Sequence, residues 1–161
     1  MPPPRVRACT GSSGPGRAAL RFAADEAAGS GEELTILRVW EAAADGGGRA
    51  KGKTGRRAAE DLVARYASEA LRHHPGLPVR ARTMDGRPAP VLVAASSGSR
   101  LLVLGDAQTA LLEPLALGAV SHDVLINIRT PTVIVHSSDG TAADDPQLAV
   151  RAPSSEGPAL A

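Results

Sequence analysis

Hydrophobic residues along the chain follow two periods, and the two alternate. Short apolar runs typical of strands are separated by longer stretches in which apolar residues recur every three or four positions, as on one helix face. The pattern predicts five strands, at Val6–Thr10, Leu34–Trp40, Val79–Met84, Leu101–Leu104 and Thr132–His136. It predicts four helices between them, one from the Gly11–Pro15 turn to about Ala28, and the others at about Ala58–His73, Pro88–Ala95 and Gly118–Ile128.

This alternation predicts an α/β fold with a doubly wound, five-stranded parallel sheet built by right-handed crossovers. We expect one such domain over residues 1–136. Residues 137–161 are rich in Ser, Pro, Ala and Asp without a periodic core pattern, and are predicted to be a disordered tail. Because doubly wound sheets bind ligands beyond the carboxyl ends of their strands, candidate binding segments follow three of the strands, at Thr10–Gly16, Val39–Gly48 and Gly105–Gly118.

Several motifs at these strand ends carry a resemblance to a known family. They are Thr10-Gly11-Ser12 followed by Arg17–Ala27, then Gly86-Arg87-Pro88-Ala89, then Leu101–Gly105, Gly118-Ala119-Val120-Ser121 and Pro131–Val135. Over about residues 5–136 the chain resembles the universal stress protein family. The resemblance implies a Rossmann-like sheet with strand order 3-2-1-4-5 and a stress-response or regulatory role.

The resemblance also implies a place for a nucleotide. Family members that bind ATP carry the pattern Gly-x2-Gly-x9-Gly-[Ser/Thr], in which backbone amides and a helix N-terminus hold the phosphates. Gly105 and Gly118 match the first and third glycines of this pattern. Gln108 and Ala119 replace the second glycine and the hydroxyl, and Thr10 replaces the family's first-strand Asp.

Two carboxylates, Asp106 and Glu113, also lie in the segment that would face a polyphosphate, and they would repel it. We therefore expect ATP binding to be lost or weakened, and assign no cofactor. The resemblance places the candidate binding site at Thr10, Gly11, Ser12, Val39, Gly105, Gly118, Ala119, Val120 and Ser121.

Composition excludes several other classes of function. The 161 residues include 18 basic and 17 acidic side chains, and only three aromatic ones, so neither charge nor base stacking favours a nucleic-acid partner. The single cysteine, Cys9, is predicted to be buried and unreactive. No nucleophile–base arrangement and no metal-ligand spacing is present, which predicts a non-enzymatic protein. Neither a secretory signal nor an apolar run of about 20 residues is found, so we expect a cytoplasmic protein.

A second glycine-rich segment keeps an alternative open. Gly47–Thr54 matches the P-loop pattern Gly-x4-Gly-Lys-[Ser/Thr], in which Lys53 would hold phosphate and Thr54 a magnesium ion. The alternative function is thus an ATP-binding switch with weak hydrolysis, using Gly105–Gly118 or Gly47–Thr54. Residues 45–57 have a net charge of +4 and are predicted to be a flexible solvated loop, whereas residues 137–161 carry −3, so the two could attract one another weakly.

Two further expectations concern the sheet itself. Arg7 lies in a strand that should be covered on both faces, so either its side chain reaches along the sheet to solvent or the strand is frayed or shifted. The last strand would be a sheet edge, and the resemblance implies that family dimers form there. We expect a homodimer through Val133–His136, together with a protein partner that the sequence leaves unidentified.

Overall fold

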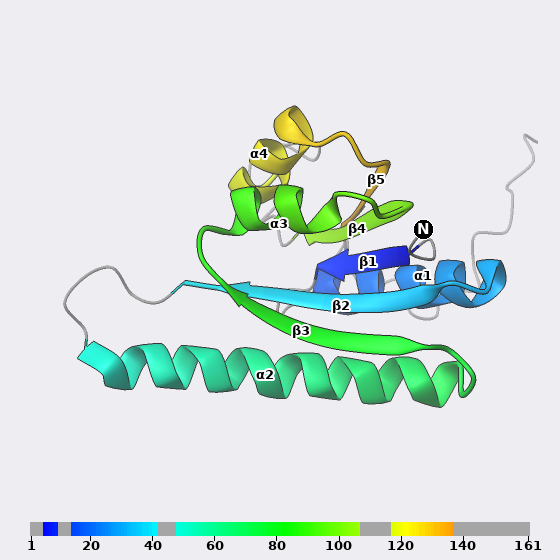
Figure 1. Ribbon diagram of the computed structural model, residues 1–161, viewed down its shortest axis with the longest axis horizontal. Coiled ribbons are helices and arrows are strands. Elements are labelled where there is room, and N and C mark those ends of the chain that lie inside the picture. Colours follow the sequence, from blue (N-terminus) through cyan, green and yellow to red (C-terminus); the bar gives the residue numbers. More distant parts are fainter. Residues whose placement is uncertain (1–4, 10–13, 42–47, 107–116, 137–161) are drawn as a thin grey trace, which may run out of the picture.

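The computed structural model describes residues 5–9, 14–41, 48–106 and 117–136, which include five strands and four helices (Figure 1). Along the chain they are β1 (Arg5–Cys9), α1 (Gly14–Ser30), β2 (Glu33–Trp40), α2 (Gly48–His73), β3 (Val79–Asp85), α3 (Pro88–Ser96), β4 (Leu101–Asp106), α4 (Ala119–Asn127) and β5 (Thr132–His136). All strand pairs are parallel, and the order is β3-β2-β1-β4-β5. The predicted fold class and strand order are confirmed.

Helices cover both faces of the sheet, as the doubly wound fold requires. Figure 1 shows α2 on one side of the strands and α3 with α4 on the other. Alternate residues of each strand point to opposite faces, so the sheet contributes side chains to two separate apolar clusters. The larger cluster joins the sheet to α1 and α2 and includes Val6, Ala8, Leu34, Ile36, Leu20 and Leu62; the smaller one lies under α3 and α4 and consists of Leu37, Val39, Leu92, Leu102, Leu104 and Val124.

Helix α2 begins at Gly48, ten residues before the predicted start, so the loop prediction for residues 48–57 is wrong. This first part of the helix has no repeating apolar residues, and hydrophobic periodicity therefore misses it. Two observations account for the helix. Arg56 Nε lies 2.9 Å from Glu60 Oε1 one turn later, and Trp40 lies beside Gly55, close enough to touch a β-carbon there at 3.7 Å. A helix over Gly48–Thr54 also lacks the loop conformation that a P-loop needs, which removes that part of the alternative function.

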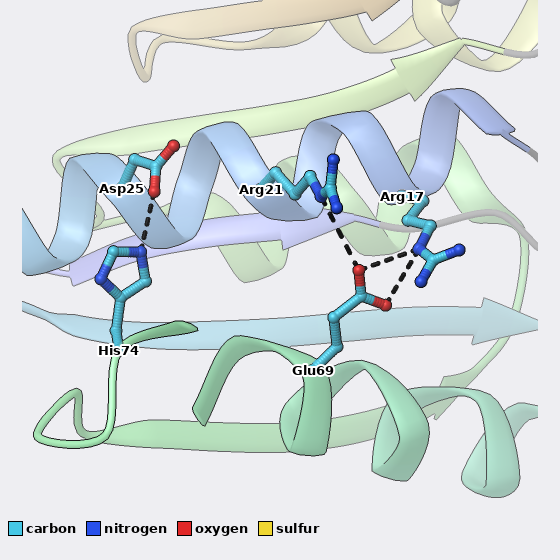
Figure 2. A network of polar contacts seen from close by, with 5 residues as sticks. All are labelled: Arg17, Arg21, Asp25, Glu69 and His74. Atoms are coloured by element: carbon cyan, nitrogen blue, oxygen red, sulfur yellow. Dashed lines mark hydrogen bonds and ion pairs between the residues drawn. The ribbon is translucent and has the colours of Figure 1, made fainter. Parts of the chain in front are cut away.

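Polar contacts tie α1 to α2 on the outer surface of the larger cluster (Figure 2). The Arg17 Nε–H donates to both carboxylate oxygens of Glu69, at 2.8 and 3.1 Å, and Arg21 lies 3.8 Å away. Nearer the end of α2, His74 Nε2 lies 2.8 Å from Asp25 Oδ1. The hydrogen bond from Arg17 holds the pKa of the buried Glu69 carboxyl below its ordinary value of 4.5, against the effect of burial.

Arg7 sits in a strand that is neither frayed nor shifted. Its neighbours in β1 pair in continuous register with β2 on one side and β4 on the other. Arg7 lies on the same face as Cys9, which packs against the cluster under α3 and α4, and its side chain is half-buried. Burial lowers the pKa of the Arg7 guanidinium, and the neighbouring Arg5 and Arg82 charges lower it further.

Candidate functional site

A pocket of about 340 Å³ opens at the carboxyl edge of the sheet, where β1, β2 and β4 end and α4 begins. This is where the strand order reverses, the usual ligand position in doubly wound folds. Most of the residues proposed from the sequence line it: Val39, Gly105, Gly118, Ala119, Val120 and Ser121. Thr10, Gly11 and Ser12 lie outside the described residues, as does the segment 107–116 with Gln108 and Glu113.

Further residues complete the pocket wall: Cys9, Arg38, Pro88, Leu92, Leu104 and Asp106. Apolar strand residues such as Leu104 give no functional signal in a sequence, because their pattern is that of any core position. The sequence predicts Asp106 only as a charge that would repel phosphate, whereas the structure shows that Asp106 lines the pocket. Burial raises the pKa of the Cys9 thiol to about 12, so this thiol is not a nucleophile at neutral pH.

Asp106 interacts with the start of α4. It is the last residue of β4, only 6% exposed, and its Oδ2 accepts a hydrogen bond of 2.8 Å from the Gly118 amide. Gly118 is the N-cap of α4 and, being a glycine, has no side chain with which to cap the helix. The amides at a helix N-terminus bind anions such as phosphate. Here the Gly118 amide already donates its hydrogen bond to the Asp106 carboxylate.

The two glycines that match the phosphate pattern are both required by contacts within the protein. A β-carbon on Gly105 would lie 2.6 Å from the Pro15 carbonyl oxygen and 2.7 Å from the Gly16 backbone. Gly105 therefore allows β4 to approach the first turn of α1. A β-carbon on Gly118 would lie 2.5 Å from Asp106 Oδ1. Contacts within the protein account for both glycines, so the glycines by themselves do not establish a phosphate site.

The position that would supply a hydroxyl is Ala119, which contributes only a methyl group to the pocket. Ser121 lies two residues after Ala119 in α4, is 5% exposed and lines the same pocket. Among the described residues, no group of three or more His, Cys, Asp or Glu side chains is arranged to hold a metal ion. None of the helices within the described ranges is long and apolar enough to cross a membrane.

The fold and the position of the pocket define a doubly wound α/β protein of the Rossmann-like class. The model of the universal stress protein family matches residues 4–136. The chain therefore belongs to the universal stress protein family, as the resemblance implied.

Solved structures show the same fold. Universal stress protein UspA from Lactobacillus plantarum is 17% identical with a TM-score of 0.70, over 82% of this chain and 97% of that one. A universal stress protein from Archaeoglobus fulgidus, in complex with dAMP, is 18% identical with a TM-score of 0.61, over 82% and 96%. A family protein from Arabidopsis thaliana with AMP bound is 17% identical with a TM-score of 0.61, over 88% and 97%. No curated protein matches the sequence.

Proposed function

We propose that the protein is a non-enzymatic, cytoplasmic stress-response or regulatory module in which ATP binding is lost or weakened. Family membership supports the stress-response role.

The observation that carries the proposal is the Asp106 carboxylate on the Gly118 amide, at 2.8 Å. A phosphate group seeking the start of α4 would have to displace this carboxylate. It would also meet a negative charge within a few ångströms, at a site only 6% exposed and thus poorly screened by water. The lost hydroxyl at Ala119 removes one further ligand from the site.

Calorimetric titration with ATP and magnesium tests this role of Asp106. We expect the wild-type protein to give no saturable binding at about 1 mM ATP, an affinity limit of about −4 kcal/mol. Asp106→Asn removes the charge, and Asp106→Ala also frees the Gly118 amide, so both variants should bind ATP more tightly than the wild type, with Asp106→Ala the tighter. Asp123→Asn, a neutralised exposed carboxylate on α4, is the matched control and should behave as the wild type.

Saturable micromolar binding of ATP by the wild type would contradict the proposal. Equal affinities for the wild type and Asp106→Ala would show that the carboxylate does not obstruct the site. In either case the family assignment and the fold would stand.

A second candidate is a nucleotide switch with weak hydrolysis that uses the pocket between Gly105 and Gly118. It is favoured by two structural relatives that hold dAMP and AMP, and by the pocket at the family position. A monophosphate places less negative charge near Asp106 than ATP does. Titration with AMP, and release of phosphate from ATP measured over hours, separate the two functions. Saturable AMP binding with ATP turnover would support the switch.

We also propose a homodimer formed through β5. This strand is an edge of the sheet, and its residues Val133–Val135 are only half-buried. Beside it in the chain, α4 exposes Leu125 (38%) and Ile126 (67%). An exposed apolar edge of this kind favours pairing with a second copy.

A further inference from the structure

The sheet face under α3 and α4 is divided into an apolar part and a charged part. The apolar residues Leu37, Val39, Leu102 and Leu104 are buried together with Leu92 and Val124. Towards the amino-terminal ends of β1, β2 and β3 the same face changes character. By strand alternation and register, it there carries Arg5, Arg7, Glu33, Arg80 and Arg82. We call these four arginines the arginine face.

The arginine face has more positive than negative charge. Glu33 is shared, because its Oε1 lies 3.3 Å from Arg5 Nε and its Oε2 lies 2.9 Å from Arg80 Nε. Four arginines and one glutamate leave a net charge of +3. Arg7 and Arg82 form no ion pair with any other residue that the structure describes.

Arg7 shows most clearly that a counter-charge is missing. Its Nε atom is shielded from water and has no hydrogen-bond partner among the described residues. A buried donor normally finds a partner. The arginine face therefore has the composition of an anion-binding surface, and the N–H fork of a guanidinium group matches the two oxygens of a carboxylate.

We propose that the arginine face binds Asp144 and Asp145 in the carboxyl-terminal segment of the same chain. Residues 137–161, which lie outside the described residues, carry four acidic side chains and one arginine, a net charge of −3 that matches the face. The segment follows directly from β5, so its local concentration at the face is of the order of millimolar.

The register of the sheet shows which acidic residues can reach. Arg7 pairs with Leu102, and Leu102 pairs with Thr132, so Arg7 lies level with the start of β5 and two strands away. The Arg7 Cα is therefore about 10 Å from β5, measured across the strands, and about 13 Å from the level of His136, measured along them. The direct distance from Arg7 to His136, where β5 ends, is about 16 Å. Asp144 follows His136 by eight residues and its backbone reaches up to about 28 Å, so Asp144 and Asp145 can approach Arg7 without full extension of the chain.

The basic start of α2 is the competing destination for this segment. Arg56 and Arg57 there are exposed, and Arg56 is already paired with Glu60. Exposed charges of this kind attract weakly because water and salt screen them. The half-buried Arg7 is screened less and lacks a partner, so the arginine face is favoured.

Two-dimensional ¹⁵N–¹H spectra of the full chain, including the arginine Nε–H region, test the proposal. In the Asp144→Asn/Asp145→Asn double variant we expect the Arg7 and Arg82 Nε–H signals to shift. Asp61→Asn, a neutralised exposed carboxylate on α2 at the other face of the sheet, should leave them in place. Salt at about 1 M, where the Debye length is about 3 Å, should reduce the difference between the wild type and the double variant.

The reciprocal experiment changes the face. Arg7→Gln should shift the amide signals of Asp144 and Asp145, and Arg57→Gln at the start of α2 should not. The proposal is overturned if the double variant leaves the Arg7 signal unchanged, or if Arg57→Gln and not Arg7→Gln moves the two amides. The double variant keeps the test valid even if Arg7→Gln fails to fold, since its substitutions lie outside the described sheet and helices. None of these outcomes depends on ATP binding.

Discussion

At the end of β4, Gly105 and Asp106 act on the same pocket by different physical means. Gly105 lets the backbones of β4 and α1 come together at distances that no β-carbon allows. Asp106 then places a carboxylate on the amide that begins α4. Gly105 thus serves packing, whereas the neighbouring Asp106 sets the charge of the site. Matching glycines alone therefore do not identify a phosphate site.

Gly105→Ala should destabilise the protein by about 1–3 kcal/mol, because the new methyl group would press on the Pro15 and Gly16 backbone at 2.6–2.7 Å. Urea denaturation followed by circular dichroism measures the loss. The control is Gly29→Ala, where a β-carbon meets open space within α1, and a gain of about 0.5–1 kcal/mol is expected. Unchanged stability of Gly105→Ala would show that β4 and α1 are not in close contact here.

At the scale of elements, α1 and α2 are joined by an apolar interface and by the Glu69 contacts at its border. The Glu69 carboxyl is buried while the Arg17 side chain stays largely in solvent. The pair therefore depends on the carboxylate remaining charged. Its pKa lies below the ordinary value of 4.5 in the folded protein, so it contributes stability that is complete above that pH and is lost as the pH falls through the folded pKa.

Glu69→Gln should lower the Tm by about 2–4 °C at pH 7, equivalent to about 1 kcal/mol for a pair with one exposed partner. The difference from the wild type should be smaller at an acidic pH well below 4.5, because protonation of the wild-type carboxyl as the pH falls through its folded pKa weakens the pair. Thermal unfolding at both pH values measures it. Glu60→Gln, which breaks the exposed pair with Arg56, should change the Tm little at either pH. A Glu69→Gln deficit independent of pH would mean that packing, not charge, is lost.

For the whole molecule, the two sheet edges differ in chemistry. Strand β3 exposes Arg80 and Arg82, and such charges on an edge oppose pairing with another chain. Strand β5 presents half-buried valines and isoleucine, and Ile126, six residues before β5 in the chain, is exposed on α4. The protein therefore has one edge suited to association and one protected from it.

Light scattering after size exclusion should give about twice the chain mass of 16.4 kDa. Ile126→Asp should halve this value, because it places a charge in the apolar surface next to β5. Leu71→Asp, a comparable change at a 41% exposed residue on α2, should leave the dimer intact. A wild-type monomer at tens of micromolar would contradict the dimer.

Much of the fold followed from local patterns. The run Leu101–Leu104 is apolar because both of its faces are buried. Glycines and prolines between the apolar segments mark where the strands and helices end, and so indicate the order of elements along the chain. The start of α2 could not be found in this way, since its first ten residues carry no repeating apolar positions. Arg7 was recognised as unusual, but only the paired strands on both sides showed that β1 is regular.

The sequence by itself determined the family, through that resemblance the strand order, and half of the pocket-lining residues, because these depend on motifs that are short along the chain. The tertiary structure alone decided what those residues do. Asp106 and Gly118 are twelve residues apart, and their hydrogen bond exists only because β4 and α4 meet at one sheet edge. The same holds for the arginine face, whose charges come from separate strands and act together only once the register of the sheet aligns them.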